Sequence, residues 1–108
     1  MAIVAPARPR EQEKTRTSRL PPYAVVVLND DDHTYEYVIM TFQKVFGYDL
    51  KKSYKLADTI HKEGRAVVWV GSKEVAEFKK EQIESMGPDR YAQKTVNWPL
   101  GVELEPVA

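Results

Sequence analysis

The feature that most constrains the fold is a β-branched run that ends abruptly in four polar residues. Tyr23-Ala-Val-Val-Val-Leu28 has the length and composition of a buried strand. Asn29-Asp-Asp-Asp32 follows it directly, and a helical pattern of apolar residues begins at Tyr35. The sequence therefore predicts a strand joined to a helix by a short acidic turn.

Two helices are predicted after this turn. Apolar residues at three- and four-residue steps give the first helix one buried face, made of Tyr35, Val38, Ile39, Phe42, Val45 and Phe46. Gly47 ends that helix because glycine tolerates a left-handed backbone. Asp49 can cap a second helix, which ends at Gly64. The apolar side of this second helix includes Leu56, Ala57 and Ile60.

The remainder of the chain predicts a strand, a helix and a last strand. Ala66-Val-Val-Trp-Val70 forms the strand, and Ser72 can cap a third helix that Gly87-Pro88 closes. We expect Val75, Phe78, Gln82 or Ile83, and Met86 to point inward from this helix. Leu100, Val102 and Leu104 alternate with other residues, as in a half-buried strand. The order β-α-α-β-α-β predicts an α+β fold, a small three-stranded antiparallel sheet packed against three helices.

Residues 1–20 differ from the rest of the chain. They contain five basic and two acidic residues, with few large apolar side chains. Such a segment buries too little surface to offset its ordering entropy. We therefore expect a flexible extension over residues 1–20 and a single domain over residues 21–108.

Composition excludes several classes of protein. Lys and Arg number 16, as do Asp and Glu, so the net charge of zero gives no general attraction to nucleic acid or anionic membranes. The lack of cysteine excludes disulfides and thiolate metal sites, and no apolar run approaches the roughly 20 residues of a membrane span. We expect a monomeric cytoplasmic protein that needs no cofactor.

The acidic turn at residues 29–32 allows two interpretations. Its side chains can cap the following helix, or its oxygens can converge on a cation. The turn is too short for a calcium loop, and a zinc site would have only His33 and His61 as nitrogen ligands. A hydrolase would need a second acidic group, for which Asp58 is the single candidate. The residues alone leave both interpretations open.

A longer pattern resembles the ClpS family of bacterial N-degron adaptors. The resemblance rests on Val27-Leu-Asn-Asp-Asp31, Glu36-Tyr-Val-Ile39, Gln43-Lys44, Phe46-Gly-Tyr-Asp49, His61, Gly64 and Glu74-Val-Ala-Glu77 with Lys79. It runs from Tyr23 to Lys79 without a gap and resumes at Pro99-Leu100. It implies an adaptor, not an enzyme, that binds N-terminal residues and passes substrates to a Clp AAA+ unfoldase.

The resemblance also implies how the substrate's α-amine is held. Asn29, Asp31 and His61 would accept hydrogen bonds from the α-ammonium, with Asp30 beside them. An ammonium has three donors and no acceptor, so acceptor groups suit it. His61 must keep one ring nitrogen unprotonated to accept, so we expect binding to weaken as this nitrogen protonates.

A pocket for the first side chain of the substrate follows from the same resemblance. Its matching positions are Tyr35 at the gate and, in the wall, Val38, Ala57, Ile60 and Leu100, although Val38, Ile60 and Leu100 also suit an ordinary core. The family commonly has methionine at the positions of Tyr35 and Ala57. We expect a pocket that is wider on one side and accepts Ile and Val beside Leu, Phe, Tyr and Trp.

The resemblance assigns unfoldase docking to the third predicted helix, through Glu74, Glu77 and Lys79. His33 departs from the family pattern, and our hypothesis is that it contacts the peptide backbone.

Three alternatives stay open at this point. They are a free-standing domain that binds amino termini without a protease, a carboxylate–histidine metalloenzyme built on residues 29–32 and His61, and a structural domain of similar topology.

Overall fold

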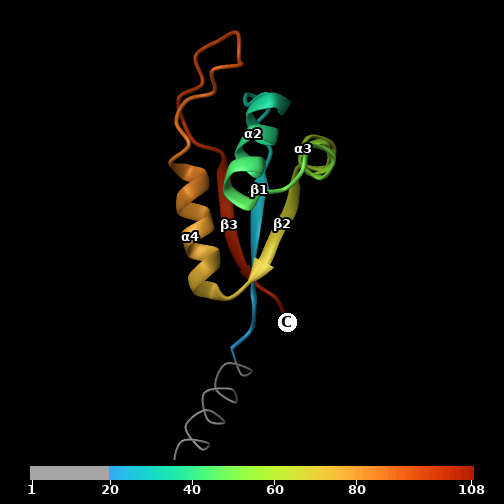
Figure 1. The fold of residues 1–108 in the computed structure, drawn as a ribbon, viewed down its shortest axis with the longest axis vertical. Helices are drawn as coiled ribbons and strands as arrows, with labels where there is room; N and C mark the ends of the chain where they lie inside the picture. Colours follow the sequence, from blue (N-terminus) through green and yellow to red (C-terminus); the bar gives the residue numbers. More distant parts are fainter. Residues whose placement is uncertain (1–19) are drawn as a thin grey trace, which may run out of the picture.

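The computed structural model describes residues 20–108, and the extension expected at residues 1–20 lies outside this range apart from Leu20. It confirms the α+β fold and the element order (Figure 1). The strands are β1 (Tyr23–Leu28), β2 (Arg65–Gly71) and β3 (Gly101–Pro106). The helices are α2 (Tyr35–Phe46), α3 (Leu50–Glu63) and α4 (Lys73–Glu84). None of the helices in the described residues is long and apolar enough to cross a membrane.

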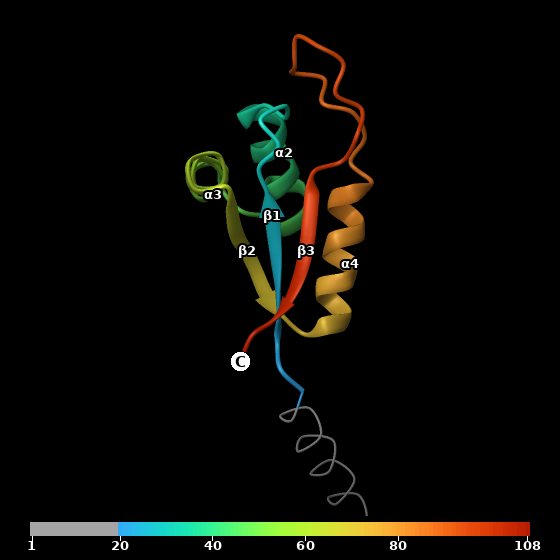
Figure 2. The same cartoon turned by 180° about the vertical axis from the view of Figure 1, so that it is seen from behind.

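The sheet has the strand order β2-β1-β3, and both pairings are antiparallel (Figure 2). The central strand β1 is the most buried, with Val25, Val26 and Val27 completely inaccessible to solvent. Leu28 at the end of β1 pairs with Arg65 on one side and Gly101 on the other. The acidic turn that follows Leu28 therefore lies next to the end of α3 and the start of β3.

Local capping signals define the end of α2, both ends of α3 and the start of α4 as the sequence predicted. The side chains of Asp49 and Ser72 accept from backbone amides in the first turns of α3 and α4. Gly47 and Gly64 follow α2 and α3 with φ of 73° and 90°, the left-handed conformation that glycine adopts without a steric penalty. These ends depend on neighbouring residues, which explains why they were predictable.

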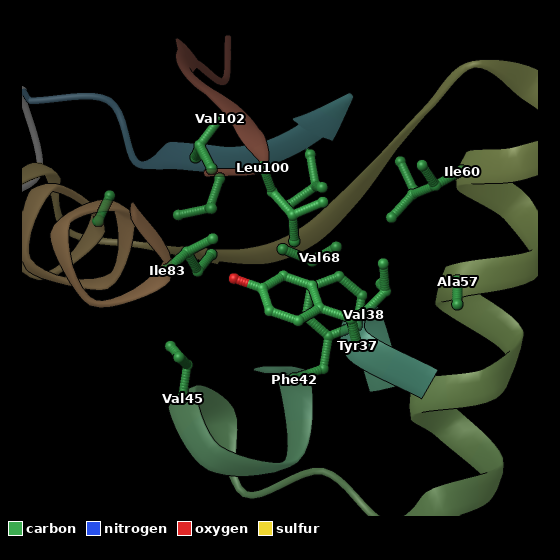
Figure 3. Close-up of a cluster of buried hydrophobic side chains, with 14 residues drawn as sticks. Tyr37, Val38, Phe42, Val45, Ala57, Ile60, Val68, Ile83, Leu100 and Val102 are labelled. Carbon is green, nitrogen blue, oxygen red and sulfur yellow. The ribbon is translucent and has the colours of Figure 1, made fainter. Parts of the chain in front are cut away.

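The core lies between the sheet and the helices (Figure 3). Its largest buried side chains, Tyr37 and Phe42, come from α2. They belong to one cluster with Val68 of β2, Val102 of β3 and Leu100, which directly precedes β3. The Tyr37 hydroxyl donates to the Gly87 carbonyl oxygen at 2.6 Å, so this ring also holds the segment after α4. A buried tyrosine needs such a partner for its hydroxyl.

The predicted inward face of α4 was wrong at two positions. Val75 and Phe78 are 39% and 57% exposed, whereas Ala76 and Ile83 are buried. Lys79, on the same side as Ala76, donates from its amine to the Val45 carbonyl oxygen at 2.8 Å. Burial of Ala76 and this bond to the end of α2 set the rotation of the helix, which the apolar pattern alone did not reveal. The helix also ends at Glu84, before Met86.

Candidate functional site

A pocket at the end of β1, between α2 and α3, gathers most of the predicted binding residues. It is lined by Leu28, Asn29, Asp30, His33, Thr34, Tyr35, Val38, Ala57, Ile60, His61 and Leu100. Asn29, Asp30 and His61 of the predicted amine site are therefore brought beside all five residues of the predicted side-chain pocket. Of the described amine-site residues, Asp31 does not line it. Glu74, Glu77 and Lys79 lie on α4, away from this pocket.

The turn itself is held by reciprocal hydrogen bonds between its first and third residues. The Asn29 amide nitrogen donates to the Asp31 carboxylate at 2.8 Å, and the Asp31 backbone amide donates to Asn29 Oδ1 at 3.2 Å. Asp31 adopts φ of 63°, a left-handed conformation that aspartate tolerates better than most residues. The Asn29 backbone amide donates to the Gly64 carbonyl oxygen at 2.9 Å. Asn29 is thus fixed at the end of α3, close to His61.

Asp30 stabilises the turn from inside. Its carboxylate accepts from the backbone amides of Asp32 and His33 at 2.9 and 3.0 Å, and lies 2.6 Å from His33 Nδ1. Burial on its own raises the pKa of Asp30. The hydrogen bonds to the charged form outweigh burial, so the pKa of Asp30 is lowered overall. Asp30 accordingly lies beside the amine site as an ionised structural acceptor.

His33 is an interior residue, not an exposed one. Its side chain is 2% exposed, and its ring stacks on Tyr37 with 5.0 Å between centroids. Nδ1 faces Asp30, and Nε2 lies 2.9 Å from the Trp98 carbonyl oxygen. Each ring nitrogen therefore faces an acceptor oxygen. These contacts leave neither nitrogen for a substrate backbone, so the suggested contact with the peptide is not supported.

Sequence reasoning missed the residue that fixes the start of α2. Thr34, not the acidic turn, caps the helix, accepting from Tyr37 N. The buried Asp89 then accepts from the Thr34 backbone amide at 2.7 Å, from the Thr34 hydroxyl at 3.1 Å, and from Tyr91 N at 2.9 Å. Asp89 lies 55 positions away in the chain, so no local pattern could reveal it. The helix-cap interpretation of the acidic turn was therefore wrong.

The apolar wall belongs to the core and to the pocket at once. Val38, Ala57, Ile60 and Leu100 are buried members of the hydrophobic cluster, and each also lines the pocket (Figure 3). The space between them is a cavity of about 20 Å³. Such a volume holds roughly one water molecule. The extra width that we expected from Ala57 is thus not open in this structure.

Tyr35, the expected gate, is tied to α3. Its hydroxyl donates to Asp58 at 2.9 Å, and its ring lies against Tyr54 and His61, with centroid distances of 5.9 and 5.5 Å. Asp58 also pairs with Lys62 at 3.0 Å. The hydrogen bonds from Lys62 and Tyr35 lower the pKa of Asp58, whereas burial and the adjacent Asp58 carboxylate raise the pKa of Tyr35. Asp58 therefore anchors Tyr35, which lines the pocket, from outside that pocket, a role that the sequence did not indicate.

Metal binding has no geometric basis in residues 20–108. No three His, Cys, Asp or Glu side chains in this range are placed so that they could hold a metal ion together. The carboxylates of the turn are instead directed at Asn29, backbone amides and His33. The metalloenzyme alternative therefore lacks the ligand cluster that it requires.

Comparisons with known proteins agree on one family. The family model described as "ATP-dependent Clp protease adaptor protein ClpS" matches residues 18–95. The ClpS adapter of Ruegeria sp. (strain TM1040) is 41% identical over 70 residues, covering 65% of this chain but 62% of the relative, which is less than two thirds of its length. The ClpS adapter of Aromatoleum aromaticum is 41% identical over 73 residues, covering 68% of this chain and 72% of the relative.

A solved structure agrees with these sequence matches. Agrobacterium tumefaciens ClpS2 bound to L-phenylalaninamide superimposes with a TM-score of 0.68 at 30% sequence identity. The superposition covers 81% of this chain and 98% of that one. The fold described above therefore occurs in a protein whose solved complex contains an amino-acid amide.

Proposed function

Because the chain belongs to the ClpS family of ATP-dependent Clp protease adaptor proteins, we propose that its pocket binds the first residue of N-degron substrates. One observation carries the proposal. A single pocket is lined by Asn29 and His61, which have acceptor groups, and also by the apolar side chains of Val38, Ala57, Ile60 and Leu100. A free N-terminal residue has the complementary chemistry, a charged amine next to an apolar side chain.

The polar half of the pocket would bind the α-ammonium. Asn29 Oδ1 and one His61 ring nitrogen accept, and the Asp31 carboxylate, already hydrogen-bonded to Asn29, adds a negative charge nearby. Charge-assisted hydrogen bonds of this kind are stronger than neutral ones. An acetylated N-terminus offers one uncharged donor, which leaves acceptors unpaired and is therefore rejected.

The apolar half would select the first side chain. L-phenylalaninamide, the ligand of the Agrobacterium ClpS2 structure, has a free amine and a benzyl group, the same pair of features that we assign here. We propose Leu, Phe, Tyr and Trp as first residues, with Ile and Val also accepted because Ala57 occupies little of the wall.

Delivery to a Clp AAA+ unfoldase would use α4. Glu74 and Glu77 are exposed on this helix. Lys79 lies one turn after Val75 and directly follows Phe78, and both of these apolar residues are exposed as well. We propose that this surface docks on the N-terminal domain of the unfoldase. The protein would act as a monomeric cytoplasmic adaptor with no catalytic activity of its own.

A peptide titration tests the binding step. Fluorescent peptides that differ only at residue one, each prepared with a free and with an acetylated N-terminus, are titrated with the full chain. We expect acetylation to weaken binding of the Phe peptide by at least about 100-fold, because a buried charged donor is lost. Equal affinity for free and acetylated peptides would refute the proposal. With the free Phe peptide, the His61→Ala variant should show most of this loss of affinity. The His33→Ala variant tests the stability of the fold instead.

A further inference from the structure

The rim of the pocket contains a side chain that is anchored from outside the pocket. Tyr35 is the first residue of α2, and its ring lies on the stripe of α3 formed by Tyr54, Asp58 and His61. These three residues follow the spacing of four and then three that puts side chains on one helix face. The ring therefore bridges the two helices whose inner sides supply Val38, Ala57 and Ile60 to the pocket.

The anchor is a hydrogen bond to a carboxylate that is itself held in place. The Tyr35 hydroxyl donates to Asp58 Oδ1 at 2.9 Å, and Lys62 pairs with Asp58 Oδ2 at 3.0 Å. A phenol bonded to an ionised acceptor is held more strongly than one bonded to water or to a neutral group. Lys62 lies one turn after Asp58 on α3. Its amine therefore orients the Asp58 carboxylate independently of the bond to Tyr35.

The pocket that Tyr35 lines is almost filled. Its cavity of about 20 Å³ compares with on the order of 150 Å³ for an apolar cavity that accepts a benzene-sized group. The wall residues Ala57, Ile60 and Leu100 are buried in the core, and displacing them would disturb the packing. Tyr35 is only partly buried, so it is the wall residue that can move at the lowest cost.

We propose that Asp58 is a positioning residue that holds Tyr35 closed over the side-chain pocket, and that this Tyr35–Asp58 latch sets the size of the first residue accepted. The inference rests on the proposed function of the pocket. A bulky first side chain binds only to molecules in which the latch is broken. These open molecules are a small fraction of the total, so the apparent affinity for a substrate with such a side chain is reduced by that fraction. A small first side chain binds beneath the closed ring and does not meet this cost.

Four proteins test the latch: the wild type, Tyr35→Phe, Asp58→Ala and the double variant. Each is titrated with peptides that begin with Ala, Leu, Phe or Trp. We expect both single variants to bind the Phe and Trp peptides about 3- to 10-fold more tightly than the wild type, the range for the net loss of one hydrogen bond that is partly exposed to solvent. The double variant should gain no more than either single variant, since both remove the same bond. Affinity for the Ala peptide should not change.

A matched control removes a neighbouring hydroxyl. Tyr54→Phe alters a ring that also contacts Tyr35 but is not the donor to Asp58, and it should leave the ranking of peptides unchanged. Unchanged or weaker binding of Phe and Trp in Asp58→Ala and Tyr35→Phe, or fully additive gains in the double variant, would overturn the latch.

The acetylated Phe peptide separates failure of the latch from failure of the site. If the wild type discriminates against acetylation but the variants keep the wild-type ranking, only the latch is wrong. If the wild type binds free and acetylated peptides equally, the proposed function is wrong and the latch falls with it.

Discussion

His33 Nδ1 lies 2.6 Å from the Asp30 carboxylate, while Nε2 of the same ring lies 2.9 Å from the carbonyl oxygen of Trp98. The ring thereby joins the acidic turn to the segment that leads into β3. Leu100, a wall residue of the pocket, lies two positions after Trp98. One buried imidazole consequently connects the proposed amine site with the segment that leads to the proposed side-chain pocket.

The first prediction concerns this imidazole. His33→Ala removes the ring from its contacts with Asp30, Trp98 and Tyr37, which leaves a partly buried carboxylate with fewer donors. We expect a loss of about 2–4 kcal/mol in the free energy of unfolding, measured by urea denaturation. Lys94→Ala is the control, because it breaks an ion pair with Asp32 on the surface and should cost less than about 1 kcal/mol. Equal losses in the two variants would contradict the buried role of His33.

The second prediction is a pH dependence of stability. Because the pKa of Asp30 is lower in the folded protein, its ionised form stabilises the fold at pH values above its ordinary pKa of about 4. That contribution is lost as the pH falls through the lower folded value. The wild type should therefore lose its stability advantage over Asp30→Asn as the pH falls below about 4. Denaturation curves at several pH values measure the difference, and a constant difference would refute the assignment.

The third prediction is a pH dependence of binding. His61 accepts from the α-ammonium only while one ring nitrogen is unprotonated. Affinity for a Phe peptide should therefore fall as the pH is lowered from about 8 to about 5. His61→Gln keeps an acceptor but has no imidazole to protonate, so it should give a nearly flat profile. Unchanged wild-type affinity down to about pH 5 would count against His61 as a ligand.

The fourth prediction concerns the pocket wall. Ala57 is buried and lines the cavity, so Ala57→Met fills the space available to a branched first residue. We expect affinity for Ile and Val peptides to fall by about 10-fold more than affinity for Leu peptides, since a few methylene groups are worth that factor in an apolar pocket. Thermal unfolding accompanies the titration, because overpacking at a buried site costs about 1–3 kcal/mol. An unchanged ranking of the three peptides would refute this model of selectivity.

The fifth prediction separates docking from stability on α4. Glu74→Lys and Glu77→Lys should weaken binding to a Clp unfoldase N-terminal domain about 10-fold or more by surface plasmon resonance, with peptide binding unchanged. Lys79→Ala should also cost about 1 kcal/mol of stability, because the Lys79 amine donates to the Val45 carbonyl oxygen near the end of α2. Lys80→Ala removes an exposed pair with Glu84 and is the control. Full unfoldase binding by both glutamate variants would place the docking surface elsewhere.

At α4 the sequence predicted the first residues of the helix correctly but its inward face wrongly. Ser72 caps the helix through its own first turn, and the sequence indicated it correctly. The inward face was predicted from the largest apolar side chains, Val75 and Phe78, and both are exposed. A helix that packs closely on a sheet needs a small residue at the contact, and Ala76 supplies it. That requirement depends on the partner surface, which the helix sequence does not contain.

The sequence by itself determined the order of the elements, the end of α2, both ends of α3 and the start of α4. Each depends on interactions within a few residues, such as a cap, a left-handed glycine or an apolar period. Only the tertiary structure decided that Asp89 holds Thr34, that Trp98 receives His33 and that Asp58 anchors Tyr35. These bonds join residues 23 to 65 positions apart. Hydrogen bonds over such distances depend on how the elements pack, so no local pattern records them.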